Sequence, residues 1–409
     1  AKQSTDGGDL GPGPQIVGEG RDRLHHAVQS ALTLKCLRSA NAKPETIAAI
    51  LPESERSKDI EDFKYARAPD FAQECLKLMG YGEKQIRRLT PEQKALAALG
   101  FPRQAGIRAE GYGAVNTTAS LPNITLDAVN KTLQAGYTEA PSTWEGPMSQ
   151  GESASDFKTI HRVRLGAVEN LTIWLDNLPA DRAKLNDADE SYAVESYSKV
   201  VSFTWKNVVN DDLSALGRIP LNLGFAARRT VNAIAWSQIT SNPTMGDSQA
   251  LFLETATGNR LRSNLTTGAG APSVATLQTL SDKMMQMRGE NTPDETESSD
   301  ILSIMPRYIV GPTALMTTIK QLVLSAYDPA NANLAYNTAT ELIPVIEPLL
   351  DSDSTTGWYT FGSPSQIDTV EVTFLMGQEQ PVVRDWLDNE TWAQNFQVVQ
   401  TVAAKPLNH

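Results

Sequence analysis

The stretch YSKVVSFTWKNVVNDDLSALGRIPLNLGFAARRTVNAIAWSQITSN, residues 197–242, decides the fold of this chain more than any other. It opens with alternating side chains that place Val201, Phe203 and Trp205 on one face, a pattern that predicts a strand. Beyond a polar turn at residues 210–212, apolar residues recur at steps close to 3.6, which predicts a long helix. The stretch therefore predicts a long strand that leads into a long helix.

Proline residues mark the limits of this helix, and apolar residues mark one of its faces. Pro220 suits a first helical turn, and Asn242 followed by Pro243 stops the helix. The face is formed by Leu216, Ile219, Leu223, Ala227 and Ile234. Such a stripe predicts that one side of the helix packs on a core.

Composition places the chain among globular proteins of two or three domains. Its 409 residues are 40% hydrophobic and 21% charged, and no run of eighteen apolar residues predicts a membrane span. Cys36 and Cys75 lie far apart in helical apolar patterns, which predicts buried free thiols. The net charge of −12 disfavours a protein that grips DNA through its phosphates, although acidity also simply keeps a protein soluble.

The first hundred residues predict a flexible arm followed by helices. The arm, residues 1–20, is rich in glycine and proline, and an amphipathic helix follows over residues 21–37. A second helix is predicted after Pro69 and ends at Gly80. A third begins at the capping sequence Thr90-Pro91-Glu92-Gln93 and ends before Gly100.

The middle of the chain predicts a helix, an extended arm and a hairpin. The helix covers residues 123–135 and closes at Gly136, and residues 140–155 form the polar arm. A long two-stranded hairpin is predicted from residue 156 to 205, with strands near 159–165 and 192–205.

Helices and short strands alternate in the remaining sequence. Helices are predicted over residues 274–287 and 313–326, and a short strand begins at Ile309. Residues 341–350 predict a strand at the edge of a sheet because they contain Pro344 and Pro348. The acidic segment 289–300 predicts a solvated loop and lacks the spacing of a calcium-binding loop.

No arrangement of residues in the sequence predicts catalysis, and we expect no catalytic, cofactor-binding or metal site. The histidines are His25, His26, His161 and His409, and only His161 could serve a Ser-His-Asp site. Ser149 lacks the spacing of a nucleophile elbow, and no phosphate loop or zinc-ligand pattern is present. The sequence therefore argues against an enzyme.

The sequence around the long helix resembles a known family. The run SFTWKNVVNDDLSALGRIPLNLGFAARR, residues 202–229, is similar to the core signature of the Mu-like major head subunit family. In particular it resembles the capsid half of the prohead protease–major capsid fusion proteins of tailed phages. Further similarities, in the family's order, include Thr143-Trp144, Gly258-Asn259-Arg260-Leu261, Pro306-Arg307-Tyr308 and VEVTFLMGQEQPVV at residues 370–383.

This resemblance implies an α+β fold of the Hong Kong 97 type, with a spine helix and long sheet in a peripheral domain, an axial domain, an extended hairpin loop and an N-terminal arm. It divides the chain into six parts. These are an N-terminal arm and helical extension (1–104), a continuation of the arm (105–155), the hairpin loop (156–205), the spine helix (206–250), the axial domain (251–350) and the peripheral strands with the C-terminus (351–409).

The same resemblance implies a structural major capsid protein that self-assembles into an icosahedral phage head around double-stranded DNA. The implied partners are copies of itself in hexamers and pentamers, cement or decoration, scaffold and portal proteins, and DNA bound without sequence specificity, with no membrane. The implied location is the virion, after assembly in the host cytoplasm. An encapsulin-like protein nanocompartment is the alternative.

Two sets of residues are expected to contact other subunits. Arg228 and Arg229 lie in the middle of the spine helix, where pairing with acidic neighbours and simple solvation are both open. The outer part of the hairpin holds Leu171, Ile173, Trp174, Leu175 and Leu178. Burial of one Trp contributes up to about 4–6 kcal/mol, so we expect another chain to cover this cluster, unless the segment folds into its own core.

Glycines near the arm and hairpin are expected to supply hinges that adapt one sequence to unequal neighbours. They are Gly136, Gly146, Gly151 and Gly166. The first residue, Ala1, has two explanations, removal of an initiator methionine or cleavage by a maturation protease, and the resemblance favours the protease.

Overall fold

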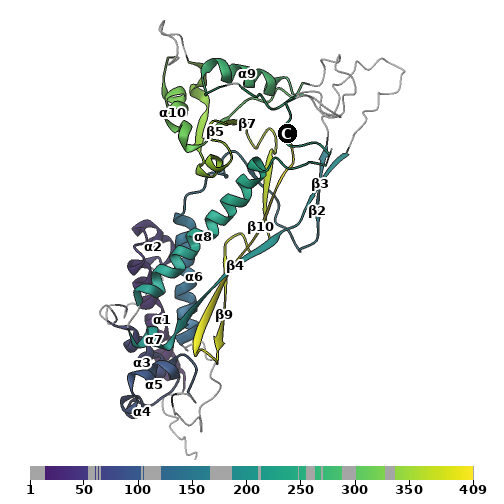
Figure 1. The fold of residues 1–409 in the computed structure, drawn as a ribbon. Helices are drawn as coiled ribbons and strands as arrows, with labels where there is room; N and C mark the ends of the chain where they lie inside the picture. Colours follow the sequence, from purple (N-terminus) through teal and green to yellow (C-terminus); the bar gives the residue numbers. More distant parts are fainter. Residues whose placement is uncertain are drawn as a thin grey trace, which may run out of the picture. The chain divides into compact units, whose positions relative to one another are not determined.

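The computed structural model describes residues 14–408 of the chain apart from several internal segments. Those segments are residues 54–59, 61–62, 64–65, 103–104, 106–120, 166–186, 211–212, 247, 255–262, 269, 288–300 and 328–336. Figure 1 shows the helices and strands of the described residues. The acidic segment predicted as a loop lies outside them, as does the outer part of the predicted hairpin.

The chain divides into two units, and each unit is made of segments that lie far apart in the sequence. Unit 1 comprises Ala1–Ala140, Tyr197–Arg228 and Gln380–Gln400, and unit 2 comprises Pro141–Ser196, Arg229–Glu379 and Thr401–His409. Three elements contribute residues to both units: β4 (Glu195–Thr204), α8 (Leu213–Thr240) and β10 (Ala393–Pro406). The six-part division of the chain stays a prediction.

Unit 1 consists mainly of helices around one apolar core. Side chains as distant in sequence as Val28, Phe71, Leu99, Leu133 and Phe203 meet in this core. The helices are α1 (Pro14–Ser39), α2 (Pro44–Ile50), α3 (Ala68–Leu78), α4 (Glu83–Arg88), α5 (Pro91–Ala98), α6 (Leu121–Glu139), α7 (Trp205–Val209) and the first part of α8.

The predicted N-terminal helices are confirmed, with two differences. Helix α1 starts at Pro14, so residues 14–20 are helical and not part of a flexible arm; proline is well tolerated as a first helical residue. The short helices α2 and α4 were not predicted, because six or seven residues are too few to show a helical period.

The predicted helix ends are formed as the sequence indicates. The Thr90 hydroxyl accepts a hydrogen bond from the Gln93 N–H at 3.2 Å, and the Gln93 side chain accepts one from the Thr90 N–H at 3.0 Å. Gly80 and Gly100, just past α3 and α5, have φ angles of 94° and 95°. These left-handed positions favour glycine, which explains why both helices stop there.

Helix α6 differs from the prediction because Gly136 lies inside it and does not end it. A Cβ atom on Gly136 would lie 2.2 Å from the carbonyl oxygen of Leu221 on α8. On the facing helix, a Cβ on Gly224 would lie 2.3 Å from the carbonyl oxygen of Leu133. The two glycines therefore let the backbones of α6 and α8 touch, and the hinge predicted at Gly136 is replaced by a tight helix crossing.

Helix α8 confirms the predicted long helix but starts earlier than Pro220 implies. It begins at Leu213, so Pro220 lies inside the helix, where its missing N–H removes one backbone hydrogen bond. On either side of Pro220, Gly217 approaches the Cys36 carbonyl of α1 and Gly224 approaches α6. Close packing on both sides keeps the helix continuous through the proline.

Unit 2 holds a small sheet of order β6-β5-β7 and part of a larger sheet in which β8 lies between β1 and β10. The strands are β1 (Ser149–Gln150), β2 (Ile160–Leu165), β3 (Asp187–Tyr192), β5 (Tyr308–Gly311), β6 (Ile343–Ile346), β7 (Tyr359–Phe361) and β8 (Val370–Phe374). Strand β9 (Val382–Asp388) belongs to unit 1 and pairs with the first half of β10.

Two helices cover the small sheet, and a second apolar core lies around Trp236. Leu277 of α9 (Val274–Met285) and Ile319 of α10 (Met316–Leu324) share a core with Ile309 of β5. The Trp236 ring meets the Phe361 ring edge-on, with centroids 6.2 Å apart. Three short 3-10 helices, η4 (Thr313–Leu315), η5 (Thr338–Glu341) and η6 (Pro348–Ser352), complete this part.

The predicted hairpin is wrong in its second strand. Strand β2 pairs with β3, with Ile160 opposite Tyr192 and Leu165 opposite Asp187, whereas residues 195–204 form β4 at the edge of the larger sheet. The break between β3 and β4 places Val194 in a buried cluster with Tyr192 and Ala403. Strand β3, DADESY, is too polar to show an alternating apolar pattern. The apolar pattern of β4 is stronger, so the sequence predicted β4 as the second strand of the hairpin.

Candidate functional site

The residues predicted to contact other subunits fall into two groups. The apolar group, Leu171, Ile173, Trp174, Leu175 and Leu178, lies outside the described residues. Of the two arginines on α8, Arg228 lies over the ring of Tyr137 in its own chain, 4.9 Å from the ring centroid, and Arg229 is exposed. The structure thus separates the two arginines, and their roles in assembly stay predictions.

The described base of the hairpin is fixed to unit 2 by a buried carboxylate. Glu371 of β8 is 6% exposed and accepts hydrogen bonds from Arg162 Nε of β2 at 2.9 Å and from the Tyr192 hydroxyl of β3. The Thr373 hydroxyl, also on β8, donates to the same Glu371 oxygen at 3.0 Å. One carboxylate therefore connects both hairpin strands to the sheet below them.

A second buried carboxylate, on the same face of β3 as Tyr192, also fixes this strand. Glu190 is 2% exposed; its carboxylate lies 3.4 Å from Lys405 Nζ of β10 and accepts a hydrogen bond from the Gly246 N–H at 2.6 Å. A Cβ on Gly246 would lie 2.4 Å from the Asp189 carbonyl oxygen, so only glycine allows this approach. The loop after α8 and strand β10 thus hold β3 in place.

The environment of Tyr192 favours the protonated form of its phenol. Burial, and then the hydrogen bond to Glu371, raise the pKa of the Tyr192 phenol above its ordinary value. The phenol therefore remains a hydrogen-bond donor to Glu371 through neutral pH. Buried polar groups that are fully paired favour a single arrangement of the elements they connect. The cluster can therefore act as a rigid base for the hairpin.

The sequence contains a signal for this cluster that was missed. In VEVTF, residues 370–374, all five residues are buried, with Val370, Val372 and Phe374 on one face. Glu371 and Thr373 occupy the opposite face, and a carboxylate inside a buried strand needs partners. The partners themselves, on β2 and β3, were not predictable because they depend on the strand pairing.

Within the described residues the structure brings together no catalytic triad. His161 Nδ1 lies 2.7 Å from Asp189 Oδ2, but both side chains are largely exposed on β2 and β3. The Ser149 hydroxyl donates to the Val370 carbonyl oxygen at 3.3 Å. No group of three or more His, Cys, Asp and Glu side chains in the described parts of the chain could hold a metal ion.

No helix among the residues that the structure describes is both long and apolar enough to span a membrane.

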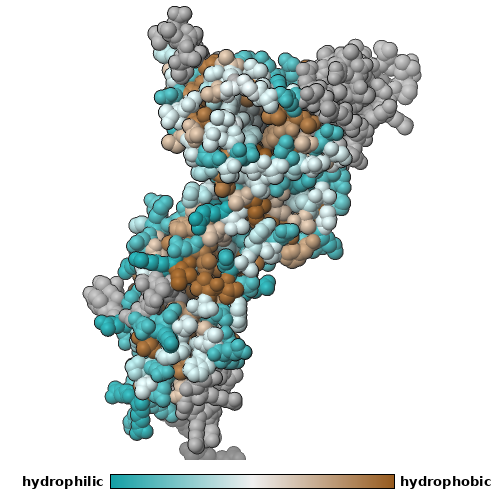
Figure 2. Space-filling model, in the orientation of Figure 1, coloured by the Kyte–Doolittle hydropathy of each residue, from teal (hydrophilic) through white to brown (hydrophobic). Residues whose placement is uncertain are grey.

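Apolar side chains are exposed on unit 1, next to helix α8. Val200 of β4 is 49% exposed and Ile219 of α8 is 38% exposed. A shallow groove beside them is lined by apolar side chains that include Val201, Leu223 and Val398. Figure 2 shows an apolar patch on the part of unit 1 where α6 and α8 lie in Figure 1. A surface of this kind is typical of a protein that contacts other chains.

A model of the phage capsid protein family matches residues 188–409, which include most of β3, the whole of α8 and every later strand of the described residues. The chain belongs to the phage capsid protein family. It is thus a structural subunit of a self-assembling phage capsid shell, and the virion capsid is its location. The predicted α+β fold of the Hong Kong 97 type is confirmed in this family, with the long helix α8 and the sheet around β10.

Several solved shell proteins are similar to the capsid protein at low sequence identity. The capsid of Myoviridae phage XM1 is 10% identical, with a TM-score of 0.38 over 64% of this chain and 87% of that one. The capsid of Ralstonia phage GP4 is 11% identical, with a TM-score of 0.40 over 66% and 82%. The SrpI encapsulin of Synechococcus elongatus is 11% identical, with a TM-score of 0.38 over 64% and 81%.

No protein in a curated collection matches the chain. The assignment to the family therefore depends on the match over residues 188–409.

Proposed function

We propose that this capsid protein is the major subunit of an icosahedral head of a tailed phage and that its shell encloses double-stranded DNA. The observation that carries the proposal is the family match over residues 188–409, a segment that contains the long helix and its sheet. Its role is structural and it catalyses no reaction. Within the family, the similarity of residues 202–229 favours the Mu-like and protease–capsid fusion group.

The shell is built from hexamers and pentamers of this one chain. Identical copies close by symmetry when the contacting surfaces are self-complementary. Assembly takes place in the host cytoplasm with scaffold and portal proteins, and cement proteins add to the outside. The net charge of −12 suits a container whose DNA must move during packing and release, because the wall repels phosphate.

The hairpin is the element that we propose to reach a neighbouring subunit. Its base, strands β2 and β3, is held within the subunit by Glu371 and Glu190. Its outer part supplies Leu171, Ile173, Trp174, Leu175 and Leu178 for burial against the neighbour. The segment that contains β2 and β3 then serves as the hairpin loop, and the parts at 206–250 and 251–350 serve as spine helix and axial domain.

The arginines of α8 are proposed to make a charged contact between subunits. Arg229 is exposed and is available to a carboxylate of a neighbour, while Arg228 supports the helix through Tyr137. We expect Arg229→Ala to lower particle yield more than Arg87→Ala, since Arg87 is also exposed but lies on α4. Equal yields would remove Arg229 from the interface.

Electron microscopy of the purified protein, together with analysis of its contents, tests the proposed function. We expect closed shells that protect double-stranded DNA from nuclease when they are isolated from infected cells. Shells that contain an enzyme and no nucleic acid would instead identify a protein nanocompartment. A protein that stays monomeric at every concentration and salt condition would contradict assembly altogether.

A further inference from the structure

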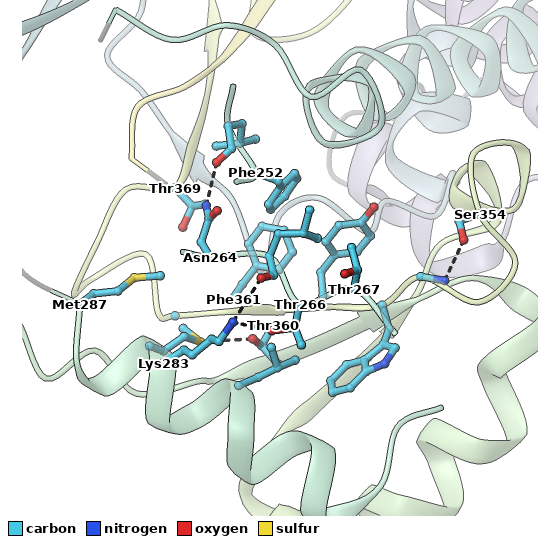
Figure 3. A pocket seen from close by; sticks show the side chains of 18 of the residues that line it. Phe252, Asn264, Thr266, Thr267, Lys283, Met287, Ser354, Thr360, Phe361 and Thr369 are labelled. Atoms are coloured by element: carbon cyan, nitrogen blue, oxygen red, sulfur yellow. Dashed lines mark hydrogen bonds between the residues drawn. The ribbon is translucent and has the colours of Figure 1, made fainter. Parts of the chain in front are cut away.

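A pocket of unit 2 with a volume of about 660 Å³ lies between the loop that follows α8, helix α9 and strand β7. This volume falls within the range of small-molecule binding sites. Figure 3 shows that side chains from these elements converge on the pocket, among them Phe252, Asn264, Lys283 and Phe361. The pocket takes no part in the proposed contacts of the hairpin or of α8.

The walls of the pocket are largely apolar and aromatic. Phe252, Trp358, Tyr359 and Phe361 line it, and the Phe252 and Tyr359 rings pack with centroids 5.4 Å apart. Trp358 is held in place because its indole N–H donates to the Gly270 carbonyl oxygen at 3.1 Å. Rings that are fixed in this way form a preformed surface for a flat apolar group.

Lys283 supplies the charge in this pocket. Its ammonium group donates to the Thr266 hydroxyl at 2.7 Å, the Leu265 carbonyl oxygen at 3.2 Å and the Ser263 hydroxyl at 3.3 Å. All three acceptors are neutral, and no carboxylate among the described residues pairs with this ammonium. The carboxylate of Glu254 accepts a hydrogen bond from Thr267.

A positive charge that is partly removed from water is stabilised when an anion pairs with it. A carboxylate can replace the two longer contacts of Lys283, to Ser263 and Leu265, and gives the ammonium a charged acceptor in place of neutral ones. Tyr359 adds a second polar group to the lining of the pocket.

We propose that this pocket binds an aromatic or aliphatic group that carries a carboxylate, with the apolar part among Phe252, Trp358 and Phe361 and the carboxylate on Lys283. The carboxylate has two possible sources, a free organic acid or an acidic side chain of another copy. The proposal concerns a ligand site and does not depend on the proposed contacts of the hairpin or of α8.

Calorimetric titration of the full chain with 1-naphthoate and with the neutral isostere 1-naphthamide tests the proposal. We expect naphthoate to bind about tenfold more tightly or better, because a hydrogen bond to a charged group is stronger than one to a neutral group. Lys283→Met should remove this difference, and Lys320→Met, an exposed lysine on α10, should leave it unchanged.

A second variant tests the proposal even if Lys283→Met does not fold. Thr267 is exposed at the rim of the pocket, so Thr267→Trp should fill the pocket and abolish binding of both compounds. Equal binding of naphthoate and naphthamide to the parent protein, or unchanged naphthoate binding by Thr267→Trp, would overturn the proposal.

Titration of assembled particles distinguishes the two sources of the carboxylate. Binding to both subunits and particles indicates a free acid as the ligand. Binding to subunits alone indicates that a carboxylate of a neighbouring copy already occupies the pocket in the shell. Absence of binding to either form contradicts the site.

Discussion

At the scale of single residues, Gly224 shows how tightly α6 and α8 pack. A Cβ at this position would lie 2.3 Å from the Leu133 carbonyl oxygen and 2.7 Å from the Tyr137 backbone nitrogen. Backbone atoms cannot move away as a flexible side chain can, so a methyl group forces the two helices apart. The crossing therefore depends on glycine for space and not for backbone flexibility.

We expect Gly224→Ala to lower the free energy of unfolding by about 1–3 kcal/mol, the usual cost of overpacking a close contact. Denaturation of the subunit in urea measures this. Gly82→Ala is the matched control, because a Cβ there meets only the Gln85 side-chain oxygen, at 3.7 Å. A Gly224 variant as stable as the Gly82 variant would disprove the tight crossing.

Loss of the Glu371 side chain should affect strands β2 and β3 as well as its own strand, β8. We expect Glu371→Ala to lower the free energy of unfolding by about 2–3 kcal/mol, since Arg162 and the Tyr192 hydroxyl lose their acceptor. Glu379→Ala is the control, because Glu379 bonds to Ser153 at the surface and its loss should cost less than about 0.5 kcal/mol. Similar costs for both variants would show that the hairpin base is not held by Glu371.

The two buried thiols predict a loss of stability in alkaline solution. Burial raises the pKa of Cys36 from 9.0 to about 12, and burial, followed by the charge of Glu74, also raises the pKa of Cys75. Above pH 9 the unfolded chain releases these protons while the folded chain keeps them. Stability therefore falls as pH rises, by up to about 1.4 kcal/mol per pH unit for each thiol.

Urea unfolding at pH 8 and pH 10 in the presence of a reductant measures this effect. The parent protein should lose more stability between these pH values than the double variant Cys36→Ala, Cys75→Ala. If both proteins lose the same amount, the thiols do not control the alkaline response.

At the scale of elements, α5 shows that a local signal can define a helix start. We expect Thr90→Ala to lower the free energy of unfolding by about 1 kcal/mol, because the Gln93 N–H loses its acceptor. Thr90→Ser keeps a hydroxyl and should stay within a few tenths of a kcal/mol of the parent. Equal losses in both variants would show that the cap contributes nothing.

Strand β6 shows a second local signal, the effect of proline at a sheet edge. It pairs in the structure with β5 alone, as Pro344 indicated. The N–H groups of Ile343 and Glu347 point to β5 and donate to Arg307 and Gly311, so Pro344 occupies a position whose missing N–H faces outward. An edge without that donor is a poor template for a further strand. Contacts of this sheet with other copies should therefore use side chains.

At the scale of the whole molecule, assembly should depend on apolar groups that the single chain leaves available. We expect Trp174→Ala to lower particle yield severalfold with little change in subunit stability, because the proposed burial of the indole takes place only in the shell. Sedimentation of assembly reactions measures the yield, and Trp174→Phe should restore most of it. A normal yield from Trp174→Ala would exclude the proposed contact.

The sequence by itself determined those helix ends that carry a local signal. Helix α5 starts at Thr90 and stops before Gly100 because a cap and a left-handed glycine act over a few residues. The apolar residues of 213–240 recur with a helical period, which predicted the long helix. Pro344 predicted the position of β6 at the edge of its sheet. The resemblance of residues 202–229 led to the capsid family because many local matches occur in the family's order.

Only the tertiary structure decided how these elements meet. Gly136 predicted the end of a helix, but it lies inside α6. Its close contact there is with Leu221, more than eighty residues later in the sequence. Strand β3 is held through Glu190 and Tyr192, whose partners Lys405 and Glu371 lie about two hundred residues away in the sequence. Local patterns encode local hydrogen bonding, whereas strand pairing, helix crossings and buried charges depend on which distant surfaces come into contact, and those contacts exist only in the folded chain.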